Sequence, residues 1–369
     1  MSTASETLVH RRQRVRHLLN ETRLDALLVT GEQNVRWLSG FTGDSTWLLV
    51  TGDSEILLSD FRFRVQIEEE CPGVASVIRD SSQSLFEVLA AILSARQIGQ
   101  CGVESHLLTV ESLHSLQQAA PGTDWVSTSW EIEQLRAVKD AGEIAEIRLA
   151  IQRAEQALDC LKTILSPQRT ERELATELEY ALRGQGASGF CFPAIVAVGD
   201  RAALPHYRPA DRPVSASPIL LIDWGARNPS GYCSDLTRTL LTGKSEKTFE
   251  QVYRTVLEAQ QRAIAEVAPG KTCREIDAVA RNHIQEKGYG QYFDHGLGHG
   301  IGLDVHELPR LNPRSETFLK PGMVVTVEPG IYLPGWGGVR IEDDVLVTEH
   351  GHEVLSSVAK DWESIHVSC

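Results

Sequence analysis

Four acidic residues of this chain end or interrupt strongly apolar, strand-like runs. Asp223 follows the run Pro218 to Ile222, and Glu328 follows the run Met323 to Val327. Asp235 heads the β-prone stretch SDLTRT, and Glu342 interrupts VRIEDDVLVT. A lone carboxylate in a buried strand is strongly unfavourable unless it is paired or bound to a metal. The pattern therefore predicts a polar or metal-binding site built from strand ends.

The first two acids are twelve residues apart, on either side of a turn at Gly231-Tyr232. This spacing fits two neighbouring antiparallel strands, so that Asp223 and Asp235 face one point. An equally open alternative is a turn aspartate beside an aspartate that forms an ion pair with Arg238. For Glu342, the corresponding alternative is an ion pair with Arg340, two residues earlier on the same strand face.

The segment HGLGHGIGLDVHE contains His295, His299 and His306, three of the twelve histidines of the chain. Its four interspersed glycines predict an irregular backbone that approaches its neighbours closely, rather than a helix. Histidines in such loops are commonly surface residues. Imidazole is also the commonest metal ligand, so a cluster of three favours a role in a metal site.

Four acids at strand ends and a loop histidine offer oxygen ligands and one nitrogen ligand. This set suits a pair of first-row divalent ions held by bridging carboxylates better than a single structural zinc ion. Two such ions can activate one water molecule and polarise a scissile carbonyl. The residues alone thus favour a two-metal hydrolase.

The elements expected along the chain divide it into two domains, residues 1–132 and 133–369. In the first, helices at 8–22, 84–97 and 110–119 alternate with strands at 26–29, 47–50, 55–58, 76–78 and 102–104, which is typical of a small α/β domain. One long helix is expected from about 130 to 165. Beyond it, helices at 170–184, 246–267 and 273–287 alternate with β-rich stretches at 193–199, 219–224, 232–242, 323–328 and 339–348, which indicates an α+β domain.

Composition excludes several classes of protein. The formal net charge is −14 and the isoelectric point about 5.4, so no basic surface is expected to bind nucleic acid. No apolar run approaches the ~20 residues that span a bilayer, and no signal peptide is recognisable, so a cytoplasmic location is expected. The seven cysteines include no CxxC pair, which predicts free thiols in a reducing compartment.

The ordered motifs IDWGA, SDLTRT, HGLGHGIGLDVHE, VEPGIY and VRIEDDVLV resemble the pita-bread metallopeptidases, which include methionine aminopeptidase, aminopeptidase P and prolidase. The stretches NVRWLSGFTG at 34–43 and SDFRFRVQ at 59–66 resemble the additional N-terminal domain of aminopeptidase P and prolidase. The resemblance implies an α+β fold in which a smaller, creatinase/prolidase-like α/β domain precedes a pita-bread (creatinase/aminopeptidase-like) catalytic domain.

The resemblance also implies a ligand set for two divalent ions. Asp235 and Glu342 would bridge both ions, Asp223 would complete the coordination of one, and His299 with Glu328 that of the other. Manganese is the expected metal, with cobalt or zinc able to substitute, since carboxylate-rich sites favour harder ions than thiolate sites do.

Further roles follow from the same resemblance. Glu328 would shuttle a proton. His206, in LPHY, matches an active-site histidine of the Xaa-Pro branch, and His306 matches a histidine that assists proton transfer. His295 would line the pocket on the proline side, and Arg310 would hold the carboxylate of a dipeptide. Arg340 would be a partner that orients Glu342.

The implied activity is that of an Xaa-Pro aminopeptidase or dipeptidase, in which a metal-bridging hydroxide attacks the carbonyl before proline. The expected partners are short peptides with proline at the second position and a second copy of the chain in a homodimer. Whether dipeptides or longer peptides are preferred stays open. The alternatives are a creatinase-like amidinohydrolase, a lyase on the same fold, or a non-catalytic binding scaffold, because fold alone does not settle the reaction.

Overall fold

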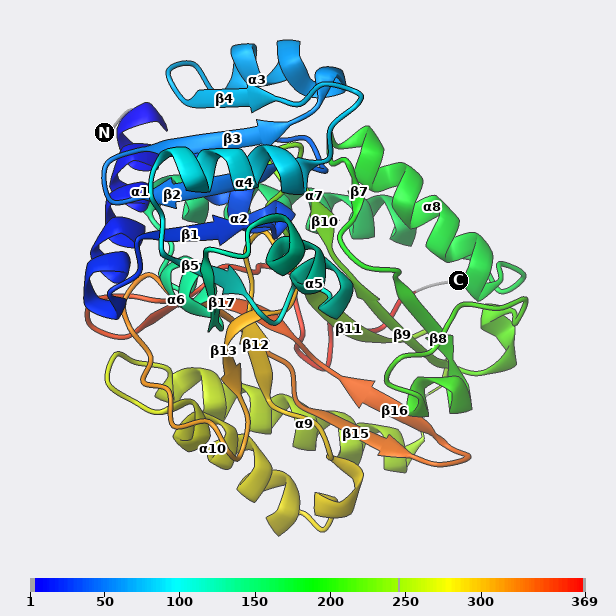
Figure 1. The fold of residues 1–369 in the computed structure, drawn as a ribbon. Helices are drawn as coiled ribbons and strands as arrows, with labels where there is room; N and C mark the ends of the chain where they lie inside the picture. The colour runs from blue at the N-terminus through cyan, green and yellow to red at the C-terminus, as the bar shows by residue number, and fades with distance from the viewer. Residues whose placement is uncertain (1–3, 245, 368–369) are drawn as a thin grey trace. The chain divides into compact units, whose positions relative to one another are not determined.

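The structure is a computed structural model that describes residues 4–244 and 246–367. The chain forms two compact units, Met1–Arg136 and Ala137–Cys369, called here the N-terminal unit and the C-terminal unit (Figure 1). The domain limits inferred from the sequence, 1–132 and 133–369, stay a prediction.

The N-terminal unit contains a six-stranded sheet in the order β4-β3-β2-β1-β5-β6. Strands β2 and β3 form the expected antiparallel hairpin, in which Leu49 lies opposite Ile56. Strand β1 pairs antiparallel with β2 and parallel with β5, so the sheet is mixed. The strands are β1 (Ala26–Val29), β2 (Trp47–Thr51), β3 (Glu55–Ser59), β4 (Ala75–Ile78), β5 (Gln100–Glu104) and β6 (Asp124–Thr128).

The helices of this unit pack apolar faces on the sheet. Leu89 and Leu93 of one helix join Leu28 and Leu49 of the sheet in a single core. That helix, α4, begins with a capping box in which Ser84 and the side chain of Glu87 exchange hydrogen bonds with each other's backbone N–H. The helices are α1 (Ala4–Thr22), α2 (Glu32–Ser39), η1 (Phe61–Phe63), α3 (Arg64–Glu70), α4 (Leu85–Ala95), α5 (Val110–Ala119) and α6 (Glu131–Arg136).

The single helix predicted over 130–165 is wrong, because the chain forms two helices there. Helix α6 ends at Arg136, and α7 starts afresh at Ala141. The Asp140 side chain accepts hydrogen bonds from the backbone N–H groups of Gly142 and Glu143, and the Glu143 side chain accepts one from the N–H of Asp140. This capping box satisfies backbone groups that a continuous helix would have used, and so fixes a new start.

The C-terminal unit combines several small sheets with two helix pairs (Figure 1). Its larger sheets have the strand orders β11-β9-β8 and β13-β12-β14-β17-β18, and β15-β16 and β10-β7 form separate pairs. The helices are α7 (Ala141–Ile164), α8 (Glu171–Gly184), η2 (Gly199–Ala203), η3 (Val214–Ala216), α9 (Lys247–Glu266), α10 (Cys273–Glu286) and η4 (Gly290–Tyr292). The strands are β7 (Gly189–Phe190), β8 (Ile195–Val198), β9 (Ile219–Trp224), β10 (Ala226–Arg227), β11 (Leu236–Leu241), β12 (Gly298–Gly300), β13 (Glu307–Leu311), β14 (Val324–Val327), β15 (Gly330–Leu333), β16 (Gly337–Arg340), β17 (Asp343–Val347) and β18 (His352–Val354).

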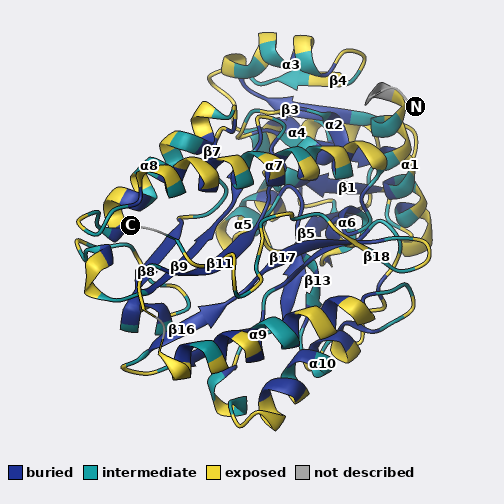
Figure 2. Cartoon of the chain, turned by 180° about the vertical axis from the view of Figure 1, so that it is seen from behind, coloured by how far each residue is buried: buried dark blue, intermediate teal, exposed yellow. Residues whose placement is uncertain are grey.

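Two apolar cores lie on opposite faces of β9, and the buried strands stand out against the more exposed helices in Figure 2. Ile219 and Leu221 join the core with α9 and α10, whereas Leu220 and Ile222 join the core with α7 and α8. Successive side chains of a strand alternate between its faces. Asp223 therefore shares the face of Leu221, toward the α9 and α10 side.

Two expectations from composition can be compared with the structure. The six described cysteines, among them the buried Cys71 and Cys233, are free thiols, as expected, while Cys369 lies outside the described residues. In the described part of the chain, no helix has the length and apolar character needed to cross a membrane.

Candidate metal centre and active-site cavity

The first two acids of the site lie on paired strands. Asp223 is the next-to-last residue of β9, and Asp235 directly precedes β11. The strands are antiparallel, with Thr237 opposite Asp223, as the twelve-residue spacing predicts. The alternative pairing of Asp235 with Arg238 is wrong, because the Arg238 guanidinium lies 2.8 Å from Asp343 instead.

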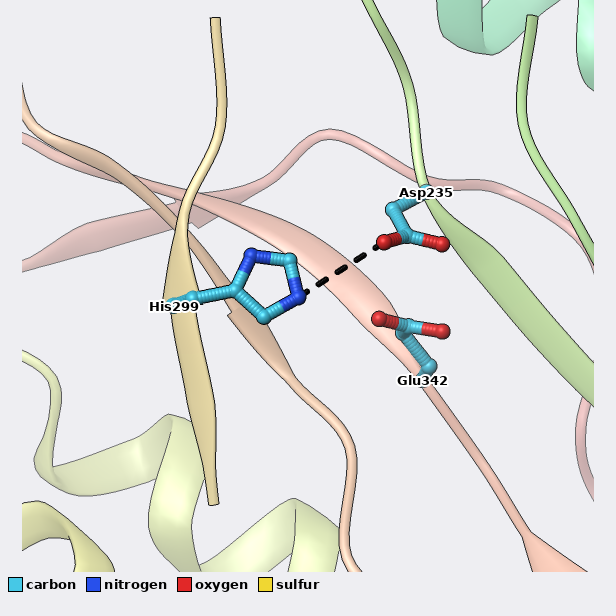
Figure 3. Close-up of side chains that lie close together, drawn as sticks. All are labelled: Asp235, His299 and Glu342. Carbon is cyan, nitrogen blue, oxygen red and sulfur yellow. Dashed lines mark ion pairs between the residues drawn. The ribbon is translucent and has the colours of Figure 1, made fainter. Parts of the chain in front are cut away.

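Asp235, His299 and Glu342 form the centre of the site. Each is buried, and one potential ligand atom from each lies within 4.8 Å of the other two. Figure 3 shows the three side chains turned toward one another from three separate segments, with His299 Nε2 3.6 Å from Asp235 Oδ2. Two carboxylates and an imidazole at this spacing can share a divalent cation.

The glycine-rich backbone around His299 permits this placement. A Cβ atom at Gly298 would lie 2.0 Å from the carbonyl oxygen of Thr326, so only glycine fits between β12 and β14. His299 Nδ1 lies 3.1 Å from the carbonyl oxygen of Gly300, which can only accept a hydrogen bond. Nδ1 therefore donates to that carbonyl, and Nε2 faces the cluster, where it can bind a metal ion in place of a proton.

Glu328 directly follows β14 and completes the His299 side of the site. Its Oε1 atom lies 3.3 Å from His299 Nε2. Burial acts to raise the pKa of Glu328, but the hydrogen bond and charge of His299 outweigh it and hold that pKa below its ordinary value. Glu328 is therefore an ionised carboxylate beside the cluster at neutral pH.

Arg340 directly contacts Asp223 rather than Glu342. Its Nη2 atom donates to Asp223 Oδ2 over 2.5 Å, and it reaches Glu342 only indirectly. Arg340 Nε donates to the Thr237 hydroxyl, which in turn donates to Glu342 Oε2 over 2.7 Å. The single strand predicted over 339–348 breaks at Ile341 and Glu342, between β16 and β17, so positions 340 and 342 do not share one strand face.

The electrostatics of the cluster fit bound cations. Burial and the charge of Glu342 raise the pKa of Asp235 well above its ordinary value, and burial and the charge of Glu328 do the same for Glu342. Asp223 Oδ1 and Glu342 Oε1 are buried and make no hydrogen bond to a described residue. Crowded carboxylates with unsatisfied oxygens are unfavourable unless positive charge compensates them. Two divalent ions would balance the four carboxylates.

The cluster opens onto a cavity of about 650 Å³ within the C-terminal unit. All the site residues named from the sequence line this cavity, although they come from segments far apart in the chain. They are His206, Asp223, Asp235, His295, His299, His306, Arg310, Glu328, Arg340 and Glu342. The structure thus brings together every residue that the sequence singled out, while their individual roles stay predictions.

Two of the cavity histidines are neutral at physiological pH. Burial and the neighbouring charge of His299 lower the pKa of His306 to about 4, and the two imidazole rings lie 4.4 Å apart. Burial also lowers the pKa of His295, whose Nε2 lies 3.0 Å from the Tyr332 hydroxyl. A neutral imidazole can both donate and accept a hydrogen bond, which suits contacts with a peptide.

Sequence reasoning missed three residues that support the cluster. The Tyr332 hydroxyl accepts a hydrogen bond from Arg340 Nη1 over 2.8 Å, and Thr237 links Arg340 to Glu342. Asp344 Oδ2 accepts a hydrogen bond from the backbone N–H of Asp235 over 3.1 Å. An acid next to the apolar run VLV was a signal for Asp344, whereas Tyr332 and Thr237 carry none that distinguishes them from ordinary strand residues.

Comparisons with known proteins place this geometry in a family. Residues 145–349 match the model of metallopeptidase family M24, and residues 11–138 match that of the creatinase/prolidase N-terminal domain. An Xaa-Pro dipeptidase of Pyrococcus horikoshii is 34% identical over 351 residues, which cover 95% of this chain and 97% of the relative. An uncharacterised peptidase of Bacillus subtilis is 37% identical over 349 residues, which cover 95% of this chain and 98% of the relative.

Solved structures agree with the sequence matches. An Xaa-Pro dipeptidase from Bacillus anthracis superposes with a TM-score of 0.93 at 37% identity, covering 98% of this chain and all of the other. An X-Pro aminopeptidase from Thermotoga maritima has a TM-score of 0.87 at 34% identity, covering 97% of this chain and all of the other. The expected two-domain pita-bread architecture is thereby confirmed. This chain belongs to metallopeptidase family M24, with the prolidases and X-Pro aminopeptidases.

Proposed function

We propose that this protein is an Xaa-Pro dipeptidase that holds two divalent metal ions in its C-terminal unit. The observation that carries the proposal is the convergence of Asp235, His299 and Glu342 at a cavity that also contains Arg310, an arginine with no ion-pair partner among the described residues of this unit. The named relatives include both dipeptidases and aminopeptidases, so the choice between them depends on this arginine.

Five side chains would hold the ions: Asp223, Asp235, His299, Glu328 and Glu342. When bound, a pair of divalent ions supplies Lewis-acid chemistry that activates water and polarises a peptide carbonyl. The contribution of the protein is to hold the ligands before the metal arrives. Arg340 fixes Asp223, and Thr237 fixes Glu342, through hydrogen bonds of 2.5 and 2.7 Å.

Proton transfer falls to Glu328, and stabilisation of the developing charge to two histidines of the cavity. The Glu328 carboxylate, kept ionised beside His299, accepts the proton of the attacking water and passes it to the departing nitrogen of proline. That nitrogen carries no hydrogen in the peptide, so it must gain a proton as the bond breaks. His206 and His306, which line the cavity, donate hydrogen bonds to the carbonyl oxygen as negative charge develops there.

The proline ring is selected by a rigid wall. His295 is held by Tyr332 at 3.0 Å and by the carbonyl oxygen of Gly296 at 2.8 Å, so its ring cannot turn away. Pro193, Ile195 and Tyr292 add apolar surface to the same cavity. A rigid, ring-shaped residue fits such a wall with little loss of conformational entropy.

Arg310 favours a dipeptide over a longer substrate. Its half-buried guanidinium lines the cavity, and it makes no hydrogen bond or ion pair to a described residue of the C-terminal unit. On β13 its backbone lies opposite His299, so the side chain starts beside the metal ligands. A free α-carboxylate on the proline would provide the bidentate partner that the guanidinium lacks.

The experiment compares hydrolysis of Ala-Pro and Ala-Pro-Gly by manganese-loaded protein and by Arg310→Met. We expect Ala-Pro to be the better substrate and Arg310→Met to raise its KM by about 10-fold or more, since a charge-assisted pair is lost. Equal cleavage of both peptides with an unchanged KM in the variant would assign the protein as an aminopeptidase instead.

The metal identity and the assembly are also proposals. We propose manganese as the metal, because four of the five candidate ligands are carboxylates, and a homodimer as the assembly, as implied by the sequence resemblance. Elemental analysis of the purified protein and sedimentation equilibrium test these two points separately. Asp235→Ala should lose both ions, and retention of both would contradict its bridging role.

A further inference from the structure

Beyond the metal ligands, the cavity carries an excess of positive charge. Four charged residues line it in addition to the ligands: Arg208, Asp294, Arg310 and Arg340. The guanidinium of Arg340 is already engaged by Asp223, and Asp294 is exposed at the surface. Two arginines, Arg208 and Arg310, therefore face the cavity with no anionic partner among the described residues of this unit.

The two arginines differ in depth. Arg310 is half-buried and lies on β13 opposite His299, next to the cluster. Arg208 is exposed, on the segment that also carries His206, so it lies toward the mouth of the cavity. A carboxylate close to the scissile bond suits Arg310, whereas Arg208 suits a second carboxylate farther from the bond.

The segment that carries Arg208, residues 204–210, is fixed to the core by one buried carboxylate. Glu171 has no exposed surface, and its Oε2 atom accepts hydrogen bonds from the Tyr207 hydroxyl over 2.9 Å and from the Ala210 N–H over 3.1 Å. Its Oε1 accepts from the N–H of Val198 over 2.8 Å. Arg208 lies between the two anchored residues, so its backbone is held in place before a substrate binds.

We propose that Arg208 binds a second carboxylate of the substrate and makes the protein prefer anionic Xaa-Pro peptides. This inference rests on the proposed function, in which Arg310 takes the α-carboxylate of a dipeptide. The second carboxylate is the side chain of an N-terminal Glu or Asp, because a neutral Xaa-Pro dipeptide carries only the α-carboxylate that Arg310 takes. A guanidinium binds the side-chain carboxylate of either residue in the same fork geometry.

The test measures kcat/KM for two matched pairs of peptides with manganese-loaded protein. Glu-Pro is compared with Gln-Pro, and Asp-Pro with Asn-Pro, so that each pair differs only in the side-chain carboxylate. We expect the anionic member of one pair to be favoured roughly five- to tenfold by the unmodified protein, as for a charge-assisted hydrogen bond near solvent. In Arg208→Gln the ratio should fall to about one, and Arg208→Lys should recover part of it.

The matched control is Arg274→Gln, which removes an exposed arginine that pairs with Glu316 on the surface. The kcat/KM ratios of the peptide pairs should not change in this variant. Arg274→Gln and Arg208→Gln remove the same charge, but only Arg208→Gln removes it at the cavity mouth. A preference that survives Arg208→Gln in both pairs, or that falls equally in Arg274→Gln, would overturn the inference.

Binding provides a readout that does not need turnover. Calorimetric dissociation constants of the same peptides for the metal-free protein should show the same dependence on Arg208, and equal constants for both members of both pairs would also overturn the inference. Cleavage of Gln-Pro by the unmodified protein separately tests the proposed function. The peptidase proposal and the Arg208 proposal can therefore fail independently.

Discussion

Replacing Asp235 by asparagine should stabilise the metal-free protein while destroying its response to metal. The Asp235 carboxylate lies within 4.8 Å of ligand atoms of His299 and Glu342, and its side chain accepts no hydrogen bond from a described residue apart from the contact with His299. The asparagine side chain keeps the shape of the aspartate but removes one negative charge. The repulsion among the buried carboxylates then falls.

The magnitude follows from the spacing. Two unit charges 4.8 Å apart repel by about 3 kcal/mol at the effective dielectric constant of ~20 that suits protein sites. Part of this repulsion is already relieved by proton uptake in the metal-free protein. We therefore expect Asp235→Asn to raise the free energy of unfolding without metal by about 1–3 kcal/mol.

The sign of the pH dependence is fixed by the direction of the pKa shift. The pKa of Asp235 is raised well above 3.8 in the folded protein, mainly by burial and the charge of Glu342. Folding is then favoured when this group is protonated, and that contribution is lost as the pH rises above 3.8 toward the folded-state pKa. The stability advantage of the variant should thus be absent near pH ~4 and should grow toward neutral pH.

The assay is urea denaturation at several pH values, with a chelator and with saturating Mn²⁺. The unmodified protein should gain about 4 kcal/mol when the metal concentration is ~1,000 times its dissociation constant, and the variant should gain little. Asp159→Asn, a change at an exposed site, is the matched control. It should neither stabilise the metal-free protein nor weaken the stabilisation by Mn²⁺. A metal-free variant that is less stable than the unmodified protein by about 1 kcal/mol or more would refute the reasoning.

Three further predictions concern residues around the cluster. Arg340→Met leaves Asp223 without its buried partner, so urea denaturation should show a loss of about 3–5 kcal/mol, and a loss below ~1 kcal/mol would contradict the role of the pair. His306→Gln should lower kcat about 100-fold with unchanged metal content. Because the pKa of His306 is about 4, the rate should show no ionisation of this residue near pH 6.5, and a step there that the variant removes would contradict its neutral state. Glu171→Ala strands three hydrogen-bond donors, so thermal unfolding should report a loss of about 3–5 kcal/mol, and an unchanged melting temperature would show that the 204–210 segment is held by other contacts.

Local sequence could predict those site residues whose chemistry is unexpected among their neighbours in the chain. Asp223 and Glu328 stand out because an acid at the end of an apolar strand needs a partner. Asp235 follows from its spacing to Asp223, since a strand pair brings residues on either side of a short turn together. The glycines around His299 indicated close backbone contact, and Gly298 lies so close to Thr326 that no side chain fits.

The parts that sequence could not predict depend on contacts between distant residues. Arg340 and Asp223 are 117 residues apart, and nothing near either one indicates the other. The nearest acid in sequence, Glu342, was therefore the natural but wrong choice of a direct partner for Arg340. The second helix that starts at Ala141 was recoverable, because Asp140 and Glu143 form a D-x-x-E capping pattern within the predicted helix.

Residue types alone favoured a two-metal site formed by the four acids and a loop histidine, but the role of each ligand in it came only from the resemblance to a known family. Local pattern identifies acids and histidines that need partners. Their convergence requires that β9 pairs with β11 and that β12 pairs with β14. It also requires that β9 and β12, which are far apart in the chain, meet at one cavity. The apolar periodicity that drives strand pairing is shared by many strands, so it does not specify which strands meet.

The most direct test of the central claim is the release of free proline from Ala-Pro by the purified protein. We expect proline to appear when Mn²⁺ is present, to stop when a chelator is added, and to return when excess Mn²⁺ is restored. Asp235→Asn, folded and at least as stable without metal, should release none under any of these conditions. Absence of proline release by metal-loaded protein, or equal release by the variant, would contradict the account.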